Sequence, residues 1–139
     1  MSLRIALVGG DVQAVPAGFA RLASLGSAEL IGASGTIHTA AGNAVLVGWA
    51  FRSDNHAPVT SLTGAQVRDI AASQGRWALQ HLWGNYLLFW VDDQRDVLLL
   101  RSPITGPALF EYRGAGALCA FTDLALARAL GCGLDRLEP

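Results

Sequence analysis

Two neighbouring apolar runs that show no alternation of apolar and polar residues constrain the fold most. Residues 86–91 are all apolar, residues 92–96 are a polar turn, and residues 97–100 are apolar again. Strands joined by so short a turn are antiparallel, and a strand with one wet face would alternate. We therefore predict an α+β fold: a four-layer αββα sandwich of two antiparallel sheets flanked by helices.

The rest of the chain supplies further elements of such a fold. We expect strands at residues 3–8, 29–38, 44–51, 109–113 and 117–121, and helices at residues 15–25, 63–73, 77–81 and 123–130. Thr63 and Thr122 are the expected helix caps, and residues 52–60 form a polar loop. The side chains expected to be largely buried are those of Val45, Val47, Leu88, Trp90, Leu98 and Leu100.

Length and composition narrow the class of protein. The 139 residues suit one domain, residues 1–139, although they leave open whether the chain is a fragment of a longer synthetase. The apolar content of 52% and the net charge of -1 argue against disorder. All ten cationic residues are scattered arginines, so we expect no nucleic-acid partner. We also expect no membrane span, and the two cysteines, Cys119 and Cys132, favour a reducing, cytoplasmic setting.

Several short motifs occur in a fixed order over about a third of the chain. They are GxW at residues 75–77, LWGNYLL at 82–88, LLLR at 98–101, LF at 109–110 and FTDL at 121–124. Together they resemble the glutaminase domain of asparagine synthetases, a class II glutamine amidotransferase with the N-terminal nucleophile hydrolase fold. Shortened relatives of this type form the N-terminal domain of ATP-dependent amide-forming enzymes, including lasso peptide cyclases. The resemblance implies the same αββα sandwich.

The residues that carry the family's chemistry are replaced in this chain. The family uses a cysteine directly after the initiator methionine, where this chain has Ser2. The resemblance aligns the family's oxyanion-hole asparagine and glycine with Val47 and Gly48, and the glutamate that follows with Trp49. It aligns the aspartate that binds the substrate amine with Leu62, and an apolar residue cannot bind that charge. We therefore expect no glutamine hydrolysis.

These replacements predict a degenerate glutaminase-like domain that serves as a scaffold or interaction domain of an asparagine synthetase-related ligase. Its partner would be a synthetase domain in cis or trans, or a second copy, and ATP and magnesium would bind only if a synthetase domain follows. The predicted pocket or contact residues are Val47, Gly48, Trp49, Leu62 and Trp83. One alternative is a hydrolase that uses Ser2 as its nucleophile, and another is a free-standing interaction module.

No metal site is expected. The three histidines, His38, His56 and His81, are far apart in the sequence. The aspartates of residues 92–96 could suggest a calcium or magnesium site, but a hairpin turn explains them better because neither a glycine nor further ligands follow at a suitable spacing.

Overall fold

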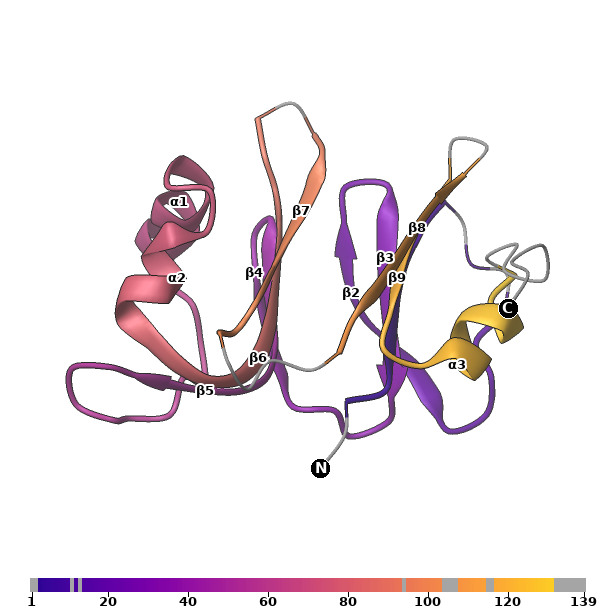
Figure 1. Cartoon of the computed structure of the whole chain (residues 1–139), viewed down its shortest axis with the longest axis horizontal. Coiled ribbons are helices and arrows are strands. Elements are labelled where there is room, and N and C mark those ends of the chain that lie inside the picture. Colours follow the sequence, from indigo (N-terminus) through magenta and orange to yellow (C-terminus); the bar gives the residue numbers. More distant parts are fainter. Residues whose placement is uncertain are drawn as a thin grey trace. The chain divides into compact units, whose positions relative to one another are not determined.

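The computed structural model describes residues 3–10, 12, 14–93, 95–103, 108–114 and 117–131. The chain forms two compact units, one of Met1–Gly35 with Ala108–Pro139 and one of Thr36–Pro107. Each unit contains one antiparallel sheet with helix packed on one face (Figure 1). The predicted α+β class with two antiparallel sheets and a few helices is confirmed.

The first unit has a five-stranded sheet in the order β2-β3-β1-β9-β8, so strands from both ends of the chain share it. Its elements are β1 (Ile5–Gly9), β2 (Phe19–Leu25), β3 (Ala28–Ala33), β8 (Phe110–Gly114), β9 (Ala117–Phe121) and α3 (Leu124–Ala129). Leu126 and Ala127 of α3 pack in one apolar cluster with Ala6 and Val8 of β1. An ion pair of 2.8 Å between Arg4 Nε and Asp123 Oδ2 also joins the start of the chain to this helix.

The helix predicted at residues 15–25 is wrong, because residues 19–25 form strand β2. A β-bulge between Arg21 and Ala23 adds one residue to this strand. The bulge puts Leu22 and Leu25, three residues apart, on the same side of the sheet, a spacing that resembles a helix. The Leu22 side chain occupies the space over Gly32, where an added Cβ would lie 2.6 Å from the Leu22 Cδ1 atom.

Two further boundaries differ from the prediction. Strand β3 ends at Ala33, and the expected single strand at residues 29–38 is interrupted near Gly35, whose φ is +84°. The cap of α3 is Asp123, which accepts a hydrogen bond from Leu126 N, and not Thr122. The Thr122 hydroxyl instead bonds the backbone of residues 3–5. It donates to the carbonyl oxygen of Leu3 and accepts from the backbone N–H of Ile5.

The second unit has a four-stranded sheet in the order β4-β5-β6-β7. Its elements are β4 (His38–Ala41), β5 (Ala44–Arg52), α1 (Gly64–Ala72), α2 (Arg76–His81), β6 (Leu82–Val91) and β7 (Val97–Arg101). The predicted helices at residues 63–73 and 77–81 are confirmed as α1 and α2, and a capping box between Thr63 and Gln66 starts α1. Strand β4 occupies most of the connection that was expected at residues 39–43.

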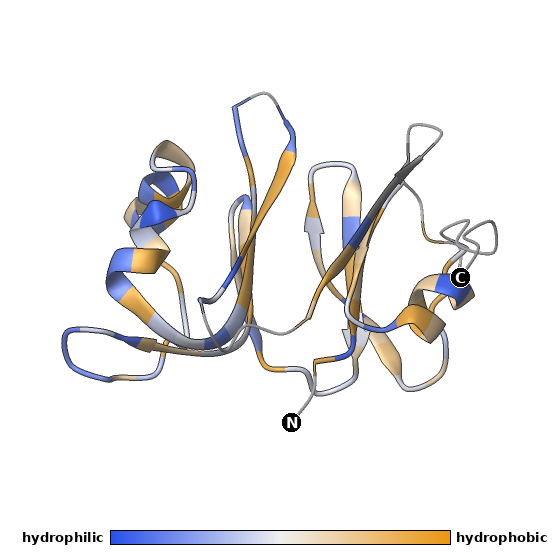
Figure 2. Cartoon of the chain, viewed as in Figure 1, coloured by the Kyte–Doolittle hydropathy of each residue, from blue (hydrophilic) through white to orange (hydrophobic). Residues whose placement is uncertain are grey.

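The apolar run at residues 86–91 is buried as its lack of alternation predicted, but the run at residues 97–100 is only half-buried. Ala44, Leu46, Leu88 and Trp90 pack with Ile70 of α1 and Ala78 of α2 in one cluster. Their neighbours of the other parity, Val45, Val47, Leu87 and Phe89, are fully buried too. Leu98 and Leu100 are only half-buried, because β7 is an edge strand of this sheet. Figure 2 shows hydrophobic residues along the strands and mixed colouring on α1 and α2.

Candidate functional site

The outer ends of β5 and β6 bend away from the rest of their sheet and run beside the helices of the same unit (Figure 1). Two glycines with positive φ lie at the bend, Gly48 at +102° and Gly84 at +139°. The carbonyl of Trp49 crosses closely over Gly84, where an added Cβ would lie 2.2 Å from its oxygen. Only glycine fits so close an approach at position 84. The contact between Gly84 and the Trp49 carbonyl therefore helps to fix the direction of the bent strand ends.

The bent ends carry an exposed aromatic group that we call the tryptophan surface: Trp49, Phe51, Trp83 and His56. Trp49 is 44% exposed and Trp83 is 48% exposed. Phe51 is paired with Trp83 across the strands, and their rings stack with centroids 4.8 Å apart. Trp49 lies two residues before Phe51, so it shares that face of the ribbon. His56 meets Trp83 edge to face at 6.1 Å.

The loop after β5 presents His56 to this surface through its own hydrogen bonds. Arg52 donates its backbone N–H to the carbonyl of Ala57 at 2.8 Å and accepts from His56 N at 2.9 Å. Asn55 Oδ1 accepts from Ala57 N at 3.0 Å. His56 itself has a φ of +57°, a conformation uncommon outside glycine. These bonds fold the loop tightly back on the end of β5.

An exposed ion pair closes the same loop. The Arg52 guanidinium contacts the Asp54 carboxylate at 3.1 Å through both Nε and Nη2. The hydrogen bond from Arg52 holds the pKa of Asp54 below its usual value, and the Asp54 carboxylate raises the pKa of Arg52 in return. Because both groups are exposed, this pair orders the loop more than it stabilises the unit.

The structure places the five predicted contact residues in different surroundings. Trp49 and Trp83 share the tryptophan surface, and Gly48 precedes Trp49 at the bend of β5. Val47 is fully buried and is paired with Leu87. Leu62, 8% exposed, belongs to the apolar cluster under the helices. Val47 alternates with the β5 residues of that cluster, so its side chain points to the other face of the sheet.

Leu62 also lines a small cavity of about 200 Å³. The cavity lies between the loop and the start of α1, and its polar lining includes Arg52, Thr63 and Gln66. Thr63 and Gln66 already bond each other's backbone in the capping box, and Arg52 is paired with Asp54. These three polar side chains therefore hold the loop and the start of the helix.

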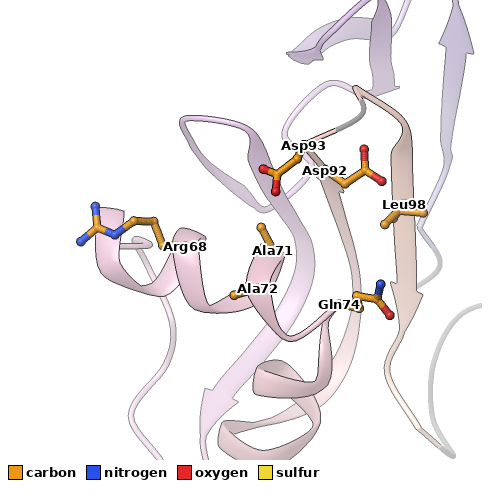
Figure 3. Close-up of a pocket in the computed structure, with 7 residues that line it drawn as sticks. All are labelled: Arg68, Ala71, Ala72, Gln74, Asp92, Asp93 and Leu98. Atoms are coloured by element: carbon orange, nitrogen blue, oxygen red, sulfur yellow. The ribbon is translucent and has the colours of Figure 1, made fainter.

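A larger open pocket, of about 540 Å³, lies between the end of α1 and the β6–β7 turn (Figure 3). Arg68, Gln74, Asp92 and Asp93 supply its polar lining. Figure 3 shows the Arg68 side chain directed away from both aspartates, so the charged groups do not converge on one point. Asp92 Oδ1 accepts from the backbone N–H of Asp96 at 2.8 Å, which confirms the predicted hairpin turn.

The other candidates do not assemble a reactive group in the described part of the chain. Ser2 and Cys132 lie outside the described residues, and Cys119 is buried in β9. His38 and His81 each use Nδ1 on a nearby backbone carbonyl. Among the described residues there is no cluster of three or more metal-binding side chains. No described helix is long and apolar enough to span a membrane.

A buried phenol and indole stand out inside the second unit. The hydroxyl of Tyr86 and Nε1 of Trp90 are buried and have no hydrogen-bond partner among the described residues. Burial raises the pKa of Tyr86 because the phenolate would lose its hydration. Both side chains belong to the apolar cluster under α1 and α2, so they contribute packing and not chemistry.

Sequence reasoning selected the two tryptophans but missed Phe51 and His56. The i, i+2 spacing of Trp49 and Phe51 was an available signal, because it places both residues on one face of a strand. The contact of His56 with Trp83 depends on the folded loop, and no local sequence pattern predicts it. Comparisons with protein-family models, curated proteins and solved structures found no match for this chain.

Proposed function

We propose that this chain is a degenerate glutaminase-like domain of an asparagine synthetase-related, amide-forming ligase, and that it acts as a scaffold or interaction domain in the cytoplasm. The motif resemblance and the two antiparallel sheets with their helices support the family. In this proposal ATP and magnesium belong to the synthetase partner and not to this domain.

The observation that carries the interaction role is the tryptophan surface. Trp49 and Trp83 each expose nearly half of their surface although the two side chains lie on paired strands beside a stacked phenylalanine. Large exposed aromatic groups are typical anchors of protein contacts, because their burial contributes a large free energy. The partner that we favour is a synthetase domain in cis or trans, and a second copy is the alternative occupant.

The surroundings of Leu62 support the loss of glutamine chemistry. The resemblance aligns this residue with the aspartate that binds the substrate amine, and here its side chain is buried among apolar residues. A charged ammonium group could not be stabilised there without a carboxylate. We expect no release of ammonia from glutamine above background when the purified protein is assayed.

Binding to the synthetase domain encoded with this chain tests the interaction role. Trp49→Ala should weaken the association by about 2 kcal/mol, measured by isothermal titration calorimetry, and leave the melting temperature nearly unchanged. Leu79→Ala is the matched control, because Leu79 is 47% exposed in the same unit but lies outside the tryptophan surface. Equal affinity of the two variants would refute the role of the tryptophan surface.

Two other functions make different predictions. A hydrolase with Ser2 as its nucleophile would turn over an amide substrate and lose that activity in Ser2→Ala. A free-standing interaction module would have the same intact mass in its native host as the 139-residue chain. Glutaminase turnover that disappears in Ser2→Ala would replace the scaffold proposal with the hydrolase.

A further inference from the structure

Strand β7 is one edge of the four-stranded sheet, and within the described residues it is hydrogen-bonded to β6 alone. Its residues 97–100 are all apolar and half-buried, and its pairing with β6 runs without a bulge. The other described edge strands each carry a feature that discourages pairing: β2 has a bulge, β4 has only four residues, and the sequence of β8 contains two charged residues. Proteins usually protect edge strands in such ways, so an edge without them is suited to accept another strand.

The hydrogen bonds between β6 and β7 show which backbone groups of β7 face outward. Ser102, directly after the strand, donates its N–H to the carbonyl of Tyr86 at 3.0 Å. Bonded and non-bonded pairs alternate along antiparallel strands, so residues 98 and 100 are bonded toward β6. The N–H and C=O groups of residues 97, 99 and 101 therefore point to the open edge.

The charges at the two ends of β7 favour an antiparallel arrangement with a second copy. The turn before the strand has three aspartates and one arginine in residues 92–96, whereas Arg101 ends the strand. Asp93, Asp96 and Arg101 are all exposed. A twofold axis perpendicular to the sheet places the Arg101 end of each copy beside the net acidic turn of the other. A parallel arrangement would instead set like charges together, which is unfavourable.

The position of the twofold axis along β7 sets the register. An axis at Leu99 pairs all five residues of the strand. An axis one residue nearer the start sets Arg101 opposite Arg95 of the second copy, and like charges opposite each other are unfavourable. An axis one residue nearer the end sets Val97 opposite Pro103, which has no N–H to donate. The register about Leu99 avoids both costs.

We propose that β7 is a self-association edge, which pairs antiparallel with β7 of a second copy about Leu99. Each Val97 then lies opposite Arg101 of the other copy, and Leu98 lies opposite Leu100. Leu98 also lines the open pocket of about 540 Å³ (Figure 3), so Leu100 of the second copy adds apolar surface beside it. The occupant is a second copy because this register sets apolar residues on apolar residues and the basic end of each strand beside the acidic turn of the other. The inference does not depend on the tryptophan surface.

Sedimentation equilibrium of the full chain over a wide concentration range tests this pairing, and the wild type should associate to a dimer as concentration rises. Leu99→Pro removes the N–H at the axis, which the pairing with β6 does not use, and should weaken dimerisation by about 10- to 100-fold. Ala40→Pro is the matched control on β4, the opposite edge of the same sheet. Gly48 donates to the carbonyl of Ile37 there, so by the same alternation the N–H of Ala40 points outward. The control should dimerise like the wild type, and circular dichroism should show both variants folded.

Charge changes at Val97 test the register separately from the fold, because each introduces a charge at the same half-buried position. Val97→Arg sets like charges opposite each other at both ends of the pairing and should weaken dimerisation by about 3- to 10-fold, whereas Val97→Glu should strengthen it by a similar factor. The double variant Val97→Arg/Arg101→Glu sets opposite charges against each other and should dimerise at least as tightly as the wild type. A wild type that stays monomeric at the highest concentration would overturn the proposal and leave this edge to a strand of another protein. Equal dimerisation of Leu99→Pro and the wild type, or of the two Val97 variants, would overturn it too.

Discussion

Replacing Gly84 with alanine should destabilise the second unit strongly, because two independent costs meet at this residue. Its φ of +139° lies in a region essentially restricted to glycine, which costs an alanine about 1–3 kcal/mol. The new Cβ would also lie 2.2 Å from the Trp49 carbonyl oxygen and 3.1 Å from its carbon. These are backbone atoms of the paired strand, so relief requires the strands to separate, at about 1–3 kcal/mol more.

We therefore expect Gly84→Ala to lower the free energy of unfolding by about 2–6 kcal/mol, measured by urea denaturation followed by circular dichroism and tryptophan fluorescence. Gly42→Ala is the matched control in the same sheet, since Gly42 has a φ of +56° and no atom within 4 Å of an added Cβ. The control should lose about 1–2 kcal/mol from backbone conformation alone. Equal losses in the two variants would show that the close approach of Trp49 has no energetic effect.

Other predictions concern buried and charged groups. Trp90→Ala should cost about 3–5 kcal/mol of stability in the same assay, and a loss below about 1 kcal/mol would mean that β6 is not central. Tyr86→Phe should leave stability equal or raise it by about 1 kcal/mol, since the buried hydroxyl lacks a described partner; a clear loss of stability would contradict this. The hydrogen bond from Arg4 lowers the pKa of Asp123, so its contribution to stability is complete above an unfolded pKa of about 3.9 and declines as pH falls through the lower folded value. Acid titration of Asp123→Asn should therefore show a shallower loss of stability below about pH 4 than the wild type, and parallel curves would refute the linkage.

The elements that could be predicted from sequence are those whose signals are local. The capping box of Thr63 and Gln66 involves residues that are close in sequence, as are the apolar residues that follow it. Helix α1 forms where these signals predict it. The continuous apolar run of β6 likewise predicts its burial, whereas the equally apolar run of β7 is only half-buried because its place at the sheet edge does not show in its composition. The prediction for β2 failed because its bulge, which depends on pairing with β3, produces an apolar spacing like that of a helix. The sequence of this segment alone does not distinguish the two.

The candidate site could be predicted only in part, for the same reason. Trp49 and Trp83 are 34 positions apart in the sequence, and the register of β5 with β6 brings them to one surface. The close approach of the Trp49 carbonyl to Gly84 at the bend is a contact between paired strands, which no local sequence pattern indicates. Leu62 packs under the helices and not beside Trp49, because the chain between them turns back through the loop after β5.

The organisation of the tryptophan surface bears on how it could bind. A flexible loop would have to be ordered on association, and each immobilised side chain would reduce the affinity. Here the backbone bonds between Arg52 and the residues near His56 already hold the loop, and the stacked rings of Phe51 and Trp83 restrict each other. Ordering this surface on binding therefore costs little, and most of the free energy of burying Trp49 and Trp83 remains available for affinity. A rigid, exposed pair of this kind suits a permanent protein contact, such as the proposed one with a synthetase domain, better than a site that must open and close around a small substrate.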